Sequence, residues 1–503
     1  MADESRVVQL RDLGGTALRG GFATLAGQVA RGVIQAVSLI VLARLLLPGD
    51  FGLVAMVAAA VRIGDVIRDA GLANAAIQAR TLTDAQRDNL FWLNTLIGAG
   101  TGAVFVALAP ALASFYGEPE LVDISRWLAL GFLVNGIATQ FGATVARQMR
   151  FAAAAVVDVA AQASGLVLAV VIAVAGGAYW ALVGQSLMIS VGVCVGYWVV
   201  AGWWPGLPHR ATPVRSFLSY GFHLLGSQLL EQFARAADTI VVGYRFGPAS
   251  AGIYNRAFQL MALPMRQLTY PSRRIALPVL ARLQDDPDAY WSFVVRGQTI
   301  LLHALVPVCA LAAALASPLV EIVLGPSWAE AAPVLAILLV GAVFETADQT
   351  SGWVLLSKGR TRALLALTLV TRPLLLVSIV VGSFAGMEGV ATGVAGSAAV
   401  FWVLGLVWIR RTVDAPVHAL WRAALRAIVG YAVPAAACAL VVSATDLPSP
   451  WAQLGVGLGA AAAVLAIEVA AWPGLRRDLV TLARSRRLLS ARRPPGPAPA
   501  PPQ

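Results

Sequence analysis

Long hydrophobic stretches, separated by short polar breaks, run along nearly the whole chain. Windows of about 19 residues identify about fourteen stretches that could cross a bilayer as helices. Twelve of them fall into two groups of six: first 21–47, 51–77, 90–115, 127–145, 151–175 and 179–203, then 217–246, 251–277, 293–316, 332–356, 363–384 and 390–409. Two more follow at 420–442 and 452–471. The pattern predicts an all-α integral membrane protein.

Composition supports this class and narrows the chemistry. Of the 503 residues 58% are hydrophobic and 13% are charged, whereas soluble domains carry about 25% charged residues. The cysteines Cys194, Cys309 and Cys438 are far apart in apolar stretches, so neither a metal site nor a cofactor is expected. No glycine-rich phosphate-binding loop is present, and the non-cytoplasmic connections are too short for a soluble catalytic domain. We therefore expect a transporter rather than an enzyme.

Basic residues lie in every second connection between the hydrophobic stretches. Clear examples are Arg147 with Arg150, Arg210 with Arg215, and Arg410 with Arg411. Basic loops remain in the cytoplasm, which predicts that both termini are cytoplasmic. The net charge of +11 is explained by this distribution, so no nucleic-acid partner is expected.

The chain contains an internal repeat. Shifting the sequence by 200 residues overlays 21–52 on 221–252, where Gln28, Pro48 and Gly52 recur as Gln228, Pro248 and Gly252. Because six spans separate the copies, the repeat is parallel and predicts two six-helix bundles. The expected organisation is an N-terminal cytoplasmic segment at 1–20, bundles at 21–203 and 217–411 joined by a linker at 204–216, two additional helices at 412–475, and a disordered basic, Pro-rich cytoplasmic tail at 476–503.

Polar side chains form a stripe on one face of the first span and of its repeat copy. Helical spacing aligns Gln28, Arg31, Gln35 and Ser38, and the equivalent positions hold Gln228, Glu231, Arg235 and Asp238. A mid-membrane arginine costs about 2.5–3.5 kcal/mol on insertion scales, so such residues usually have a function. The planar guanidinium group binds phosphate well. The predicted anion-binding set is Arg31, Gln28, Gln35, Arg62, Arg235, Gln228, Arg256, Arg266 and Arg372.

A structural interpretation of these charges remains open. Helical spacing also allows Arg235 to pair with Asp238 or Glu231, and Arg62 to pair with Asp65. Arg68 could instead extend toward the cytoplasmic interface. The intramembrane His303 is more readily explained by helix packing.

Three motifs resemble those of a known transporter family. They are GYRFGPASAGIYNRAFQL at 243–260, PVLARLQ at 278–284 and, in the first repeat copy, ARLLLPGDFGL at 43–53. Together they resemble the Wzx-type polysaccharide and O-antigen flippases, in particular the exopolysaccharide exporter branch of the multidrug/oligosaccharidyl-lipid/polysaccharide (MOP) superfamily. The resemblance covers roughly residues 15 to 475.

This resemblance implies movement of an undecaprenyl-pyrophosphate-linked oligosaccharide across the bacterial inner membrane, by alternating access around a cationic central cavity. Coupling to an ion gradient is implied too, with Asp238, Glu231, Glu345 and Asp348 as candidates. The implied partners are the lipid-linked oligosaccharide, membrane lipids, and the polysaccharide polymerase and export machinery. A lipid II flippase, a MATE-like antiporter and a membrane-embedded polymerase or ligase remain alternatives.

Overall fold

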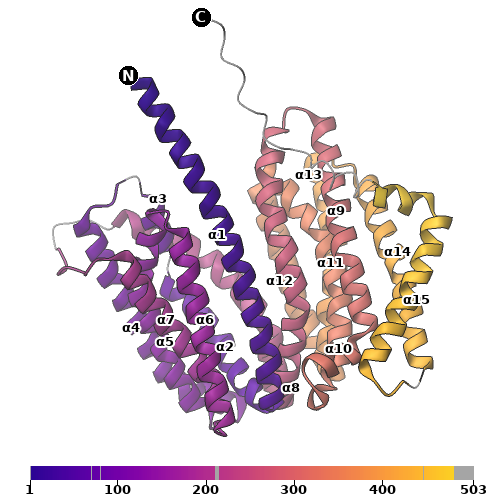
Figure 1. Ribbon diagram of the computed structural model, residues 1–503, viewed down its shortest axis with the longest axis horizontal. Helices are drawn as coiled ribbons and strands as arrows, with labels where there is room; N and C mark the ends of the chain where they lie inside the picture. Colours follow the sequence, from indigo (N-terminus) through magenta and orange to yellow (C-terminus); the bar gives the residue numbers. More distant parts are fainter. Residues whose placement is uncertain (1, 70, 80, 210–214, 446, 481–503) are drawn as a thin grey trace, which may run out of the picture. The chain divides into compact units, whose positions relative to one another are not determined.

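The computed structural model describes residues 2–69, 71–79, 81–209, 215–445 and 447–480 (Figure 1). The chain divides into unit 1, Met1–Asn255, and unit 2, Arg256–Gln503. All regular elements of the described residues are helical. Two predicted segments fall partly or wholly outside these residues: 210–214 of the linker and 481–503 of the tail.

Unit 1 contains seven complete helices and the first part of an eighth. They are α1 (Ala2–Leu45), α2 (Pro48–Asp69), α3 (Leu72–Gln78), α4 (Asp84–Tyr116), α5 (Leu121–Arg147), α6 (Phe151–Val174), α7 (Trp180–Ala201) and α8 (Arg215–Arg282). The start of α1 at Ala2 differs from the expected start near residue 21, because the polar N-terminal residues continue the helix. Helix α8 is kinked at Gly247, whose φ of 79° and ψ of −176° lie outside the helical region. Its two halves correspond to the two spans predicted at 217–246 and 251–277.

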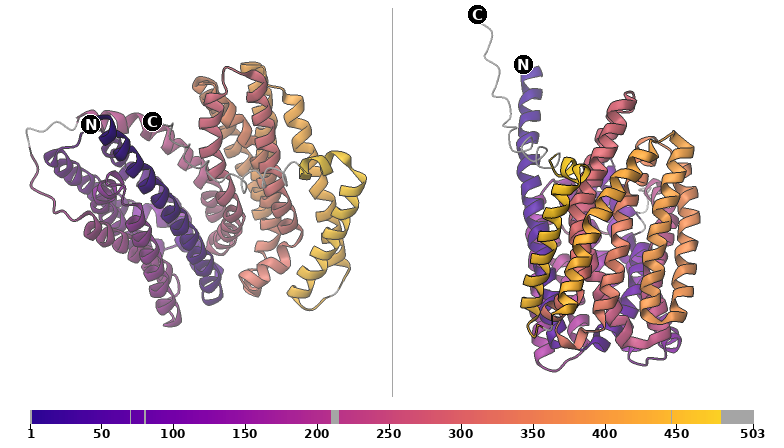
Figure 2. Two further views of the ribbon diagram at one scale, coloured as in Figure 1. Left: turned by 45° about the horizontal axis from the view of Figure 1, so that its top comes forward. Right: turned by 90° about the vertical axis from the view of Figure 1, so that its right-hand side faces the viewer.

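Seven further α-helices follow the rest of α8 among the described residues of unit 2, in addition to a short helical stretch at 473–480. They are α9 (Pro287–Ala314), α10 (Ala316–Val323), α11 (Ala331–Ser357), α12 (Thr361–Gly382), α13 (Gly386–Val413), α14 (Val417–Ala444) and α15 (Pro450–Ala471). Short 3-10 turns lie at Pro326–Trp328 and Ser383–Ala385. The hairpin of α14 and α15 forms one edge of this unit (Figure 2). The contact boundary at Asn255 assigns the first half of α8 to unit 1, and the predicted domain limits at 203–217 and 411 stay a prediction.

Ten helical stretches in the described residues are long and apolar enough to cross a membrane. One of these, Thr361–Val413, contains both α12 and α13. Helices α2 and α8 carry more charge and are not among the ten. When α2 and the halves of α8 are added and α12 and α13 are separated, the helices match the predicted number of about fourteen spans.

Apolar side chains cover the outside of the helices as well as their interior. On α6, for example, Val167, Val171 and Val174 are all exposed, at a helical spacing that places them on one face. An apolar outer surface of this kind suits a hydrocarbon environment, where each helix satisfies its own backbone groups. The chain is therefore a multi-pass membrane protein.

The two copies of the repeated turn lie against each other within unit 1. A Cβ atom on Gly52 would overlap the carbonyl oxygen of Pro248, and one on Gly252 would overlap the carbonyl oxygen of Pro48. Each copy thus places its glycine against the proline of the other copy, so the contact is reciprocal. Glycine is required at both positions because the backbones approach so closely. Near this crossing the fully buried Met56 belongs to a core cluster with residues from α2, α4, α5, α7 and α8.

Candidate functional site

One carboxylate joins three helices of unit 1. The Nη1 of Arg31 on α1 donates to Oδ2 of Asp158 on α6 at 2.7 Å. The hydroxyl of Tyr197 on α7 donates to the other oxygen, Oδ1, at 2.9 Å. Close packing makes this possible, because a Cβ on Gly27 would lie 2.6 Å from the Cβ of Ala155 about one turn away. Both oxygens of Asp158 are therefore engaged, and the guanidinium of Arg31 is held at a defined place.

The Arg31 side chain remains open to its surroundings. It is 41% exposed, whereas Asp158 is 26% exposed. A guanidinium group carries five N–H donors, so the bond to Asp158 leaves donors for a second anion. This arrangement can bind a phosphate while the arginine stays in position.

The other members of the α1 stripe have separate environments. Gln28 and Gln35 are exposed. The hydroxyl of Ser38 accepts a hydrogen bond of 2.8 Å from the side-chain amide of Gln185 on α7. The stripe therefore contains two residues that are hydrogen-bonded to other helices, Arg31 and Ser38, and two exposed glutamine side chains.

In the first half of α8 the charges are partly paired with each other. Arg235 and Glu231 form an ion pair of 2.7 Å between exposed side chains four residues apart. Asp238 is buried and pairs with neither, because its carboxylate accepts from the backbone N–H of Thr239 at 2.6 Å and from the hydroxyl of Tyr254 at 3.2 Å. Gln228 is half-buried. Of the two pairings allowed by helical spacing for Arg235, the structure contains the one with Glu231.

On α2 Asp65 forms a salt bridge of 3.1 Å with Arg68, whereas helical spacing had suggested a pair with Arg62. Arg68 also donates to the backbone oxygen of Asn135 at 3.2 Å and to the hydroxyl of Thr139 at 2.9 Å, both on α5. A cavity of about 160 Å³ next to this network is lined in part by Asp65 and Asn135. Arg68 thus connects α2 to α5, and the expectation that it extends toward the cytoplasmic interface stays a prediction. Arg62 is exposed, and its positive charge acts on Asp238.

The candidates of unit 2 lie on three helix segments. In the second half of α8, Arg256 donates to Gln259 at 2.8 Å, and Arg266 is exposed. On α11, Glu345 is exposed, and the charges of Glu345 and of Arg372 on α12 both act on Asp348.

Asp348 faces α13 across a close contact between helices. A Cβ on Gly405 would lie 2.5 Å from both Oδ1 of Asp348 and Oγ of Ser351. The glycine leaves space for a carboxylate and a hydroxyl to converge, and oxygen atoms of these types suit a hard cation or a proton. No group of three or more His, Cys, Asp or Glu side chains that could hold a metal occurs among the residues that the structure describes.

Sequence reasoning missed Asp158, Tyr197 and Gln185. A signal for the first was present, because Asp158 is the single charged residue in the apolar helix Phe151–Val174. An isolated acid in a span calls for a partner of opposite charge. The partner's identity was hidden, since Arg31 lies 127 residues away in the chain.

Comparison with known proteins shows that the chain is similar to polysaccharide biosynthesis proteins and to membrane transporters. A family described as polysaccharide biosynthesis proteins matches residues 41–333. The chain is similar to the teichuronic acid biosynthesis protein TuaB of Bacillus subtilis (strain 168), at 25% identity over 297 residues, which are 59% of this chain and 62% of TuaB. It is also similar to the lipopolysaccharide biosynthesis protein WzxC of Escherichia coli (strain K12), at 24% identity over 364 residues, 71% of this chain and 73% of WzxC. The match therefore spans less than two thirds of TuaB.

Solved structures show the same fold at low sequence identity. The lipid II flippase MurJ, in an inward closed conformation, superposes with a TM-score of 0.67 at 11% identity over 91% of this chain and 99% of MurJ. A multidrug resistance MATE family transporter of the MOP superfamily superposes with a TM-score of 0.60 at 16% identity, over 78% of this chain and 96% of that one. The predicted all-helical membrane fold is confirmed.

Proposed function

Because the chain belongs to the polysaccharide biosynthesis protein family, we propose that it is a flippase for an undecaprenyl-pyrophosphate-linked oligosaccharide. Membership confirms the predicted resemblance to Wzx-type flippases of the MOP superfamily. The oligosaccharide repeat unit moves from the cytoplasmic to the periplasmic leaflet of the bacterial inner membrane, for exopolysaccharide, capsule or O-antigen synthesis. Both termini lie in the cytoplasm, and the chain transports its cargo without changing it chemically.

The observation that supports this cargo best is the fixed and partly open guanidinium of Arg31. A pyrophosphate carries its charge on oxygen atoms that accept paired N–H donors, which is the recognition that arginine provides. Arg31 is held by Asp158 at 2.7 Å and keeps 41% of its side chain exposed. The exposed amides Gln28 and Gln35 on the same helix face can hydrogen-bond sugar hydroxyls.

Movement across the membrane requires an energy source, and the acids of the chain supply candidates for coupling it to an ion gradient. Asp238 is buried among hydroxyl and amide donors, and Asp348 converges with Ser351 beside Gly405. Glu231 and Glu345 are exposed. We assign the coupling role to Asp348 first, because Asp238 already has donors for both of its oxygens.

The test is transport of a fluorescent polyprenyl-pyrophosphate oligosaccharide in proteoliposomes. Arg31→Ala and Arg235→Ala are compared with wild type at equal amounts of folded protein. The matched control is Arg126→Ala, because Arg126 forms an exposed 3.4 Å pair with Asp123 at the start of α5. We expect Arg31→Ala to lower transport about tenfold or more, which corresponds to a charge-assisted contact of about 1.5–3 kcal/mol, and the control to transport normally. Wild-type-like transport by Arg31→Ala would remove this arginine from the cargo site.

Lipid II is a second candidate cargo, since the fold matches that of a lipid II flippase and this lipid also carries a pyrophosphate. The same proteoliposomes loaded with labelled lipid II separate the two cargos. A folded wild-type protein that moves lipid II but not the oligosaccharide would overturn the proposed cargo. Movement of neither, under several imposed ion gradients, would favour the antiporter or polymerase alternatives.

A further inference from the structure

A hollow lies in unit 2 where the helices α13 and α14 part from each other. They are joined by residues 414–416. From this connection α13 packs mainly on α11 and α12, whereas α14 packs mainly on α9 and α15. The volume of the hollow is about 340 Å³, and ligand pockets measure roughly 300–1,000 Å³. It is lined by Arg410, Ala415, Pro416, Val417, His418 and Trp421.

Arg410 supplies the positive charge of this hollow. Its side chain is exposed on the last turn of α13 and forms no hydrogen bond or ion pair with any residue that the structure describes. The acid of the connection, Asp414, is exposed and does not line the hollow. The five N–H donors of the guanidinium are therefore available to an anion from outside the protein.

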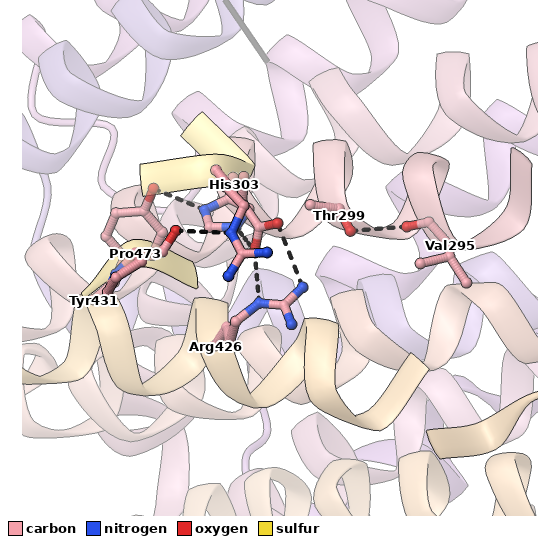
Figure 3. Close-up of polar contacts among 8 residues, drawn as sticks. Val295, Thr299, His303, Arg426, Tyr431 and Pro473 are labelled. Atoms are coloured by element: carbon pink, nitrogen blue, oxygen red, sulfur yellow. Dashed lines mark hydrogen bonds and ion pairs between the residues drawn. The ribbon is translucent and has the colours of Figure 1, made fainter. Parts of the chain in front are cut away.

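A second arginine of unit 2, Arg426 on α14, is neutralised within the protein. Its Nε donates to one carboxylate oxygen of Asp478 at 2.8 Å, and its Nη2 donates to the other at 3.4 Å (Figure 3). Asp478 lies in the short helical stretch 473–480 after α15. The chain thus provides a carboxylate partner for Arg426, whereas its described residues provide none for Arg410.

The length of α13 places Arg410 at the level of the lipid headgroups. With 28 residues the helix is about 42 Å long, and the hydrocarbon core of a bilayer is about 30 Å thick. The exposed side chains of Val400, Val403 and Val407 lie at helical spacing on the same face as Arg410. This face is therefore suited to lipid chains along the valines and to a lipid phosphate at the arginine.

The wall of the hollow on α14 is held in place by aromatic stacking. Trp421 stacks on Trp402 of α13, with the ring centroids 4.5 Å apart and 4° between the ring planes. Tryptophan favours the membrane–water interface, because its ring is apolar but carries one N–H donor. Leu425 and Val429 are exposed and continue the face of Trp421 along α14. Both helices thus have an apolar face that leads away from the hollow.

We propose that this hollow binds the phosphate of an anionic phospholipid from the leaflet on its own side of the membrane. Arg410 donates paired N–H groups to the phosphate oxygens, and the exposed ring of His418 in the same hollow adds a donor. The nearby Arg411 and Arg422 are exposed but do not line the hollow, and their charge favours an anionic over a zwitterionic lipid. The site goes beyond the proposed cargo contact, because Arg31 lies in unit 1.

The surroundings favour a lipid over a soluble anion. The bilayer already holds a phospholipid at the depth of Arg410, so the lipid loses less translational freedom on binding than a phosphate from solution. Its chains can remain along the exposed valines of α13 while its phosphate contacts the guanidinium. A soluble phosphate has the polar contacts alone.

The test is native mass spectrometry of the full-length protein, titrated in detergent with phosphatidylglycerol or with phosphatidylcholine of the same acyl chains. Arg410→Gln removes the charge that lines the hollow. Arg411→Gln is the matched control, because it removes the same charge from the neighbouring exposed residue, which does not line the hollow. Ala415→Leu fills the hollow and keeps every charge.

We expect the wild type to prefer phosphatidylglycerol, and Arg410→Gln to weaken its binding about tenfold or more, as for a charge-assisted contact. Ala415→Leu should have a similar effect. Arg411→Gln should weaken binding by about fivefold or less, which is the effect of one arginine near an anionic surface. If Ala415→Leu folds poorly, the two arginine variants decide the result.

Two results would overturn the proposal. Equal weakening by Arg410→Gln and Arg411→Gln would show that the lipid is attracted by the basic surface as a whole and not by the hollow. Displacement of phosphatidylglycerol by an equal concentration of inorganic phosphate would assign the hollow to a soluble anion.

Discussion

Replacing Asp158 by asparagine tests whether this residue limits the affinity of Arg31 for its cargo. The substitution keeps the size of the side chain but removes the negative charge. The single amide oxygen can still accept from Arg31, and the amide NH2 then donates to the Tyr197 hydroxyl, which now accepts. In the wild type the carboxylate lies 2.7 Å from the guanidinium, and under the proposed function it would compete with an incoming phosphate. Asp158→Asn removes that competition while Arg31 stays near its place.

The size of the effect follows from the exposure of the pair. A hydrogen bond to a charged group contributes about 1.5–3 kcal/mol, but Arg31 is 41% exposed and Asp158 is 26% exposed, so solvent screens part of it. We therefore take about 1.4 kcal/mol as the free energy by which the Asp158 carboxylate weakens cargo binding, which corresponds to a tenfold change in affinity. The half-saturating cargo concentration should fall about tenfold in Asp158→Asn. The maximal rate should fall as well, because tighter binding slows release. Arg31→Ala should instead raise the half-saturating concentration.

The assay is initial-rate transport in proteoliposomes over a range of cargo concentrations, together with thermal unfolding of the purified protein. Asp123→Asn is the control, because Asp123 pairs with Arg126 at 3.4 Å with both side chains largely exposed. Such pairs contribute about 0–1 kcal/mol, so transport should not change. A rise in the half-saturating concentration for Asp158→Asn, similar to that of Arg31→Ala, would refute competition and would leave Asp158 as a positioning residue only.

Three further predictions concern the repeat, a helix cap and ion coupling. Gly52→Ala should destabilise the fold by about 1–3 kcal/mol, measured by thermal unfolding, because its Cβ would overlap a backbone oxygen, whereas Gly49→Ala, with nothing within 4 Å, should unfold like the wild type. Thr83→Ala should cost about 1 kcal/mol in the same measurement, because it removes the capping box with Gln86 at the start of α4, and an unchanged unfolding temperature would contradict this role. Asp348→Asn should remove the dependence of transport on an imposed ion gradient while retaining cargo binding, and a gradient dependence equal to that of the wild type would exclude it as the coupling residue.

The sequence was informative about contacts between residues close together in the chain. The pair of Glu231 and Arg235 followed from helical spacing, because residues four apart share a face. The repeat also predicted that the turns at Pro48 and Pro248 would be equivalent, and the structure places them in reciprocal contact. Helical periodicity predicts contacts within one helix, and sequence self-similarity predicts which positions of two copies are equivalent. Both can be found without knowing how distant helices pack.

The contacts between distant helices could not be predicted in the same way. Arg31 and Asp158 are 127 residues apart, and Arg426 and Asp478 are 52 residues apart across a hairpin and a turn. A hydrophobic pattern identifies each span but does not say which spans are neighbours in a bundle of many similar apolar helices. Partner choice depends on packing, such as the close approach of α1 to α6 at Gly27.

The pairing of these charges changes how a cationic site in an apolar bundle should be understood. An unpaired arginine in hydrocarbon is costly, so several arginines of the predicted set and its neighbourhood carry a carboxylate partner: Arg31 with Asp158, Arg68 with Asp65, and Arg235 with Glu231. A count of arginines therefore overestimates the positive potential that a cargo meets. The exposed fraction of the side chain distinguishes Arg68 from Arg31. The Arg68 side chain is 14% exposed and is hydrogen-bonded to α5, whereas the Arg31 side chain is 41% exposed although Asp158 holds its guanidinium group. In the proposed cargo site a phosphate would share Arg31 with Asp158, and the acid would then set how tightly the cargo binds and how readily it leaves.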